Sequence, residues 1–211
     1  MTPAKQRKAK KKLNEDPIFK AAMKKIKPID LLPSGNVFNE LVKNIVYQQI
    51  SYKAAETIYG RFEKLVGTGY LPADLLVYAP EDFRAVGFSS RKATYVLNIA
   101  QYFKDNDLYD CDWSQLSDEE IITTLSNIKG VGEWTAQMIL IFELHRPDVL
   151  PTKDLAIQQV MQELYGIKEV KKDLLKKMVE LAEPWRPYRT LATLYLYGWK
   201  RASKEKAKLL K

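Results

Sequence analysis

The stretch from Leu125 to Gln158 constrains this chain most, because two glycines and an acid interrupt a helical pattern. Gly130 and Gly132 lie two positions apart between apolar helical segments. This spacing predicts a helical hairpin that needs positive φ and is too tight for a Cβ. The first backbone N–H groups of a helix that starts after Gly132 have no partners within that helix and therefore suit a phosphate. We expect an anion-binding hairpin here.

An acid and an aromatic residue follow this hairpin. Asp154 comes after Pro151 and directly before an apolar helical run, so we expect it at a helix N-terminus, where the helix dipole favours an ionised carboxylate. Taken alone, such an aspartate is ordinarily just a helix cap. Trp134 falls on the first turn of the helix after Gly132. A buried tryptophan usually belongs to a core, but one beside a phosphate site is well placed to line a pocket or stack on a base.

Composition limits the kinds of protein that this sequence can encode. The chain has 211 residues, 46% of them hydrophobic, which is enough to bury the core of one domain or of two small lobes. A formal net charge of +8 favours a polyanionic partner. Cys111 is the only cysteine and His145 the only histidine, which excludes a disulfide, a Cys/His zinc site and a four-cysteine iron–sulfur cluster.

No apolar run reaches the roughly 18 residues of a membrane span, and the basic N-terminus has no apolar signal region. We therefore expect no membrane partner and a cytoplasmic, nucleoid-associated location.

The hydrophobic residues follow helical spacing along the chain, and no segment of any length alternates with period two. This predicts an all-α protein with roughly ten helices. Asn36 and Ser51 are placed to cap two of them, and Ser117 with Glu120 forms a capping box. Residues 1–12 hold six basic residues and no acid, which predicts a disordered tail over residues 1–15 that either aids solubility or attracts nucleic acid.

Four segments of the sequence resemble the helix-hairpin-helix DNA glycosylase superfamily, and within it the 3-methyladenine DNA glycosylase II branch. They read N-I-V-Y-Q-Q-I-S-x-x-A-A, I-K-G-V-G-x-W-T-A, L-P-x-x-D-x-x-I and E-P-W-R-P-Y-R-T-x-A-x-x-Y-L, in the order of the family. The resemblance covers about residues 36 to 200. It implies two helical lobes, residues 37–146 and residues 16–36 plus 147–211, with the active site in the cleft between them.

The resemblance also implies roles for individual residues. Asp154 would be the catalytic carboxylate, which stabilises positive charge on the sugar and orients or deprotonates water. Gln49 would fill the gap left by a flipped nucleotide, and Gln48 beside it would probe the opposite base from the minor groove. The phosphate-binding group would comprise Lys129, Gly130, Val131, Gly132 and Thr135. The carbonyl oxygens of Ser126, Ile128 and Val131 would hold a structural Na⁺ or K⁺. The base pocket would comprise Trp134, Tyr47, Met138, Leu155, Tyr188 and Leu194.

The resemblance implies a monofunctional enzyme that excises alkylated purines from double-stranded DNA and leaves an abasic site. Bifunctional relatives carry a lysine where Trp134 stands, so we expect no lyase activity and no catalytic cofactor. Met138, Leu155 and Leu194 occupy places where the best-known members have aromatic residues, and Tyr47, Tyr188 or Tyr195 could compensate. We expect the protein to be a monomer.

Two alternatives stay open. A less aromatic pocket would also suit a glycosylase for deaminated or mismatched bases, such as uracil or hypoxanthine. A helix-hairpin-helix module that binds damaged or branched DNA without cutting it is the non-enzymatic alternative.

Overall fold

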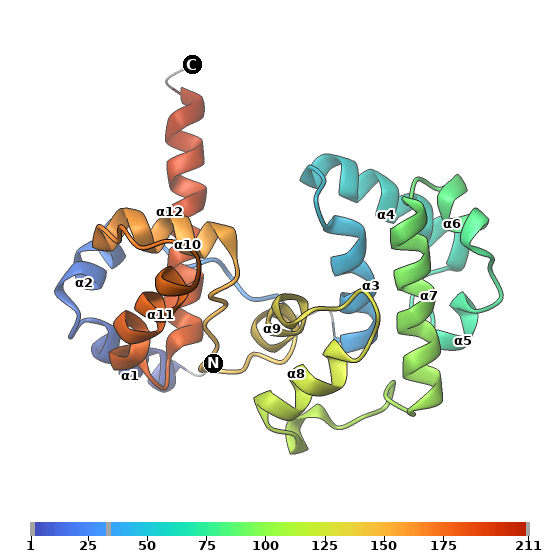
Figure 1. Ribbon diagram of the computed structural model, residues 1–211, viewed down its shortest axis with the longest axis horizontal. Coiled ribbons are helices and arrows are strands. Elements are labelled where there is room, and N and C mark those ends of the chain that lie inside the picture. Colours follow the sequence, from blue (N-terminus) through green and yellow to red (C-terminus); the bar gives the residue numbers. More distant parts are fainter. Residues whose placement is uncertain (1–2, 33–34, 210–211) are drawn as a thin grey trace. The chain divides into compact units, whose positions relative to one another are not determined.

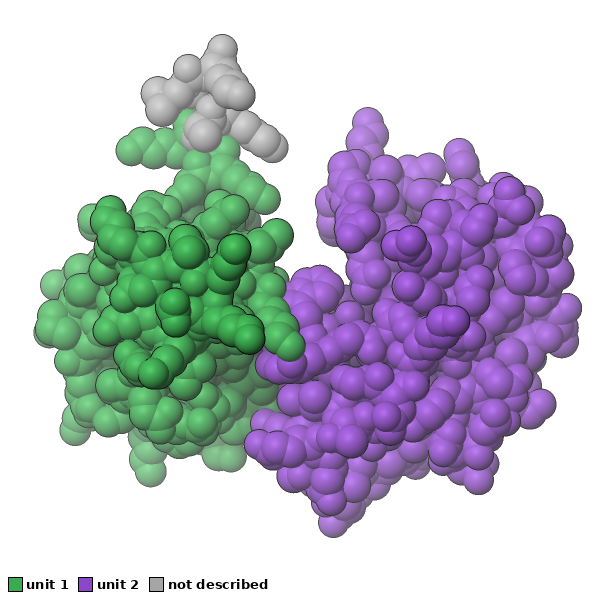
Figure 2. Space-filling model, viewed as in Figure 1, with its two compact units in different colours: residues 1–31, 145–211 green, residues 32–144 purple. Residues whose placement is uncertain are grey.

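The computed structural model describes residues 3–32 and 35–209, which form twelve α-helices and two 3-10 helices without any strand (Figure 1). The prediction of an all-α protein is therefore confirmed. None of the helices in these two ranges combines the length and hydropathy needed to cross a bilayer. The chain divides into two compact units (Figure 2), one of residues 1–31 with 145–211 and the other of residues 32–144. We call them unit 1 and unit 2.

Unit 2 is built around its longest helix, α7, which packs against α3, α5 and α6. Predicted caps begin its helices: the side chain of Asn36 accepts the backbone N–H of Asn39, and Ser117 and Glu120 form a capping box. The unit contains α3 (Val37–Tyr47), α4 (Tyr52–Val66), α5 (Pro72–Leu75), α6 (Pro80–Ala85), α7 (Ser90–Asp105), η1 (Trp113–Gln115), α8 (Asp118–Ser126) and α9 (Glu133–Phe142).

Unit 1 joins the beginning and the end of the described chain around a shared core. Trp185 is fully buried, its ring centroid lies 4.8 Å from that of Phe19, and its indole N–H donates to Asp16. Because Asp16 also caps α2, one carboxylate ties the N-terminal helices to the C-terminal part. The unit contains α1 (Pro3–Leu13), α2 (Pro17–Met23), α10 (Leu155–Tyr165), α11 (Lys171–Ala182), η2 (Glu183–Trp185) and α12 (Arg189–Leu209).

The N-terminal segment differs from the sequence prediction. Residues 1–15 were expected to be a disordered tail, but residues 3–13 form α1, and residues 1–2 lie outside the described part. Ala9 and Leu13, one helical turn apart, are fully buried in the core of unit 1, whereas the residues from Ala4 to Lys8 are exposed. Two apolar residues on one stripe thus suffice to hold a strongly basic helix, because its charges stay in water.

Candidate active site

The hairpin between α8 and α9 has the tight geometry predicted at Gly130. The backbone N–H of Val131 donates to the carbonyl of Ile128 at 2.9 Å, and Gly130 has φ of +110°. A Cβ placed on Gly130 would lie 2.3 Å from the ring of Tyr95 on α7. Both the backbone conformation and the close approach of this ring therefore require glycine.

Gly132 differs from this expectation. It is the N-cap of α9 with φ of −99° and ψ of 172°, which any residue adopts. A Cβ there would meet no heavy atom within 4 Å. The prediction that both glycines serve a tight hairpin is therefore wrong for Gly132, whose missing side chain instead leaves open space before the N-terminus of α9.

Side chains of helix α7 contact the hairpin. The Asn98 side-chain amide donates to the carbonyl of Lys129 at 3.0 Å, and the Tyr95 ring lies against Gly130. Ile128 and Val131 are buried, whereas Lys129 is exposed. The described residues contain no group of three or more His, Cys, Asp or Glu side chains that could hold a metal ion. A cation held by main-chain oxygens of the hairpin stays a prediction.

Thr135, predicted among the phosphate ligands, is only 3% exposed. Its hydroxyl accepts the side-chain amide of Gln48 at 3.4 Å and so contacts the end of α3. As the third residue of α9, Thr135 has a backbone N–H without a partner one turn earlier in the helix. The role of Thr135 in phosphate binding stays a prediction.

The corner between α3 and α4 is rigidly supported. The ammonium group of Lys92, on α7, donates to the carbonyls of Val46 and Gln48, both at 2.8 Å, and burial lowers the pKa of this lysine. Gln49 is exposed and has φ of +57°, a strained conformation for a residue with a Cβ. Asp107, His145 and Lys171 also have positive φ, so this conformation does not by itself assign a role to Gln49, which stays a prediction. Sequence reasoning missed Lys92.

In unit 1, Asp154 lies where the sequence predicted, at the N-cap of α10. One carboxylate oxygen accepts the backbone N–H groups of Ala156 at 2.8 Å and Ile157 at 3.0 Å. The side chain is only 8% exposed, so the first turn of α10 fixes the carboxylate in one orientation. The adjacent side chain of Leu155 is 71% exposed.

The second carboxylate oxygen of Asp154 accepts the hydroxyl of Tyr197 at 3.0 Å. Burial and the negative charge of Asp154 both raise the pKa of Tyr197, so its hydroxyl keeps its proton and acts as a donor at neutral pH. Sequence reasoning missed Tyr197. Its one signal was the spacing on α12, where it follows Thr190 and Thr193 by seven and four positions, on the same face of the helix.

That face of α12 also holds the segment that leads to Asp154, residues 146–154, which we call the strap. The hydroxyl of Thr190 donates to the carbonyl of Arg146 at 2.6 Å and accepts the N–H of Val149 at 2.9 Å. The hydroxyl of Thr193 donates to the carbonyl of Val149 at 3.2 Å. Both threonines are almost fully buried. Their hydroxyls therefore provide hydrogen-bond partners for backbone groups of a loop that has no regular backbone pairing of its own.

An ion pair fixes the strap at a further point. The guanidinium of Arg189 binds both carboxylate oxygens of Asp148, at 2.8 and 3.0 Å, and also its carbonyl at 2.9 Å. Arg186 approaches the same carboxylate at 2.6 Å. Arg189 is mostly buried, so this two-pronged pair is geometrically defined, unlike an ordinary exposed ion pair.

The predicted base-pocket residues are divided between the units. In unit 2, Trp134 lies on the first turn of α9 and is partly buried. Tyr47 is half-buried, with its ring centroid 5.8 Å from that of Tyr52. Met138 is 5% exposed. In unit 1, Leu155 adjoins Asp154, whereas Tyr188 and Leu194 belong to the body of the unit, Tyr188 half-buried against its core and Leu194 buried on α12.

The comparison with known proteins now decides the family. Residues 42–187 match the family described as HhH-GPD superfamily base excision DNA repair protein. The chain belongs to this superfamily. Among curated relatives, DNA-3-methyladenine glycosylase 1 of Schizosaccharomyces pombe is 34% identical over 163 residues, which cover 76% of this chain and 71% of that protein. The DNA-3-methyladenine glycosylase of Saccharomyces cerevisiae is 35% identical over 153 residues, which cover 66% of this chain and 51% of that protein.

Solved structures agree with this assignment to the HhH-GPD superfamily. The Schizosaccharomyces pombe 3-methyladenine DNA glycosylase in complex with abasic DNA has a TM-score of 0.78 and 31% identity, covering 90% of this chain and 95% of that one. The DNA-3-methyladenine glycosidase of Bacillus halodurans also has a TM-score of 0.78, with 33% identity, covering 92% and 89%. The HhH-GPD fold therefore extends over most of this chain, and the hairpin and Asp154 both lie within the residues that match the family.

Proposed function

We propose that this HhH-GPD protein is a monofunctional DNA glycosylase that excises alkylated purines, of the 3-methyladenine and 7-methylguanine type, from double-stranded DNA. The observation that carries the proposal is the fixed carboxylate of Asp154, held by two backbone N–H groups on one oxygen and by Tyr197 on the other. Two similar proteins of yeasts are named DNA-3-methyladenine glycosylases, which supports the proposal.

Asp154 acts on the sugar in this proposal. When the bond between C1′ and the base nitrogen breaks, its electron pair leaves with the base and positive charge develops on the sugar. An ionised carboxylate stabilises that charge and orients the water that adds to C1′, and the water gives up a proton to the carboxylate or to solvent. An alkylated purine already carries a positive charge and leaves as a neutral base, so a strong general acid is not required.

Unit 2 binds the DNA backbone in this proposal. The backbone N–H groups at the start of α9, beside Gly130 and Gly132, bind a phosphate, and exposed Lys129 adds charge. The open space at Gly132 supports this assignment, since a phosphate can approach the backbone there. Gln49 occupies the gap left when the damaged nucleotide is flipped out of the duplex, and Gln48 contacts the opposite base.

Three further features complete the proposal. Trp134 stands on the first turn of α9 where a lyase would need an amine, so hydrolysis leaves an abasic site for later steps of base excision repair. The carbonyls of Ser126, Ile128 and Val131 hold a Na⁺ or K⁺ that strengthens the phosphate site, and catalysis needs no cofactor. We expect the enzyme to act as a monomer on nucleoid DNA in the cytoplasm.

A panel of lesion duplexes tests the proposal. Purified protein is incubated with methylated DNA and with duplexes that carry hypoxanthine or uracil, and the released bases are separated by chromatography. Release of 3-methyladenine or 7-methylguanine without strand cleavage is expected. Release of uracil or hypoxanthine alone would show a glycosylase of the other substrate class, and tight binding without any release would show a non-catalytic module.

A further inference from the structure

The face of α12 that organises the active site continues past it toward the C-terminus. Tyr197 contacts Asp154, and Arg201 and Lys204 follow at positions i+4 and i+7. At about 100° per residue, these two side chains leave the helix within about 40° of the direction of Tyr197. A rise of 1.5 Å per residue places them roughly 6 and 10 Å further along the helix axis. We call Arg201 and Lys204 the α12 ridge.

The two residues of the α12 ridge present their charge to solvent. Both side chains are exposed, and no ion pair among residues 3–32 and 35–209 involves either of them. Two cations on one face of a helix repel each other, and no ion pair in the described part of the chain offsets this repulsion. A polyanion would compensate that repulsion.

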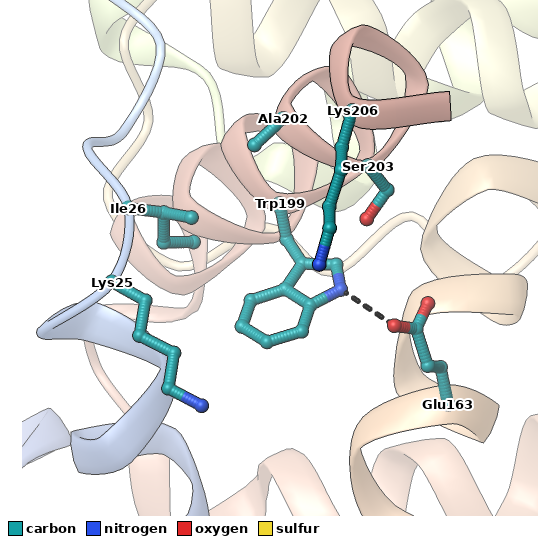
Figure 3. A pocket seen from close by; sticks show the side chains of 7 residues that line it. All are labelled: Lys25, Ile26, Glu163, Trp199, Ala202, Ser203 and Lys206. Carbon is teal, nitrogen blue, oxygen red and sulfur yellow. Dashed lines mark hydrogen bonds between the residues drawn. The ribbon is translucent and has the colours of Figure 1, made fainter. Parts of the chain in front are cut away.

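The opposite face of α12 has a different environment. Trp199, Ala202, Ser203 and Lys206 line a cavity of about 600 Å³ together with Lys25, Ile26 and Glu163 (Figure 3). The indole N–H of Trp199 donates to Glu163 at 3.1 Å, as the dashed line in Figure 3 shows. Lys206 and Lys25 are therefore cations of the same unit that lie on the side of the helix away from Tyr197 and from the α12 ridge.

We propose that the α12 ridge binds backbone phosphates of the DNA strand next to the nucleotide that Asp154 attacks, an inference that rests on the proposed glycosylase function. The physical reason is electrostatic. A carboxylate that approaches a deoxyribose also approaches the phosphates on both sides of that sugar, and like charges repel. The two cations of the ridge lie roughly 6 and 10 Å beyond Tyr197 along the helix axis, a spacing comparable with the Debye length of about 10 Å at 0.1 M salt, so they can offset this repulsion along the neighbouring strand. The guanidinium of Arg201 also matches phosphate geometry.

The test compares two double variants that remove the same charge from opposite faces of α12. The ridge variant is Arg201→Gln with Lys204→Gln, and the control is Lys25→Gln with Lys206→Gln. Each protein is first checked by circular dichroism for wild-type helix content. The Kd for a duplex with a non-hydrolysable abasic-site analogue is then measured by fluorescence anisotropy between 50 and 300 mM salt, conditions in which phosphate contacts dominate affinity.

Loss of two phosphate contacts lowers the slope of log Kd against log salt by about 1.8 and weakens binding at 0.1 M salt by up to about 60-fold. We expect this change in the ridge variant and less than about a threefold change in the control. Equal losses of DNA affinity in the two variants would overturn the proposal, because the number of charges and not their position on the ridge would then decide affinity. An unchanged salt slope in the ridge variant would also overturn it. Base release by the wild-type protein is assayed in parallel, so failure of the glycosylase function is seen separately.

Discussion

Substitution of Gly130 by alanine tests the tight hairpin quantitatively. The backbone φ of +110° disfavours any residue with a Cβ by roughly 1 to 2 kcal/mol. The new Cβ would also lie 2.3 Å from the Tyr95 ring, which must move out of a packed position at a cost of about 1 to 3 kcal/mol. Gly130→Ala should therefore lower the free energy of unfolding by roughly 2 to 5 kcal/mol. Guanidinium unfolding followed by circular dichroism measures this as a lower midpoint.

Gly132 provides the matched control in the same hairpin. Its φ of −99° suits alanine and its Cβ would meet no atom within 4 Å, so Gly132→Ala should change stability by less than about 0.5 kcal/mol. The added methyl group would nevertheless stand in the space that a phosphate is proposed to enter, so affinity for DNA should fall. The reasoning would be refuted if Gly130→Ala unfolded at the wild-type midpoint, or if both substitutions destabilised the protein equally.

Three further predictions concern unit 1 and the pH dependence of stability. Tyr197→Phe removes the hydroxyl that holds Asp154, so the single-turnover excision rate should fall about tenfold or more while DNA affinity stays within twofold; equal losses in both would contradict a positioning role. Asp148→Asn breaks the pair with Arg189 and leaves a mostly buried cation, which should cost about 1 to 3 kcal/mol in chemical denaturation, and a wild-type midpoint would contradict this. Burial raises the pKa of Tyr70 above its ordinary value of 10.0, so its folded form resists ionisation and stability should fall as pH rises above about 10, as alkaline unfolding curves would show; a flat curve would contradict it.

Local patterns in the sequence predicted the features that depend on neighbouring residues. The capping roles of Asn36 and Ser117, and the position of Asp154 at the start of α10, follow from side chains that bond to a backbone two or three residues away. Such contacts can be inferred from spacing alone.

Features that depend on distant contacts were missed. Tyr197 and Asp154 are far apart in sequence, and helical periodicity shows which face a tyrosine occupies but not what lies opposite. Leu13 packs in a core that forms only when the C-terminal helices return, so composition suggested disorder for its basic segment. The burial of Thr135 and the contact of its hydroxyl with Gln48 could not be read from the sequence, and its role in phosphate binding stays a prediction.

The central claim is that the fixed carboxylate of Asp154 breaks the bond between sugar and damaged base. The most direct measurement compares release of 3-methyladenine and 7-methylguanine from methylated duplex DNA by the wild-type protein and by Asp154→Asn. The amide can still accept the backbone N–H groups of α10, so the fold and the affinity for an abasic-site duplex should persist. We predict that base release falls by at least about a hundredfold. Undiminished release by Asp154→Asn, with DNA binding intact, would contradict the account.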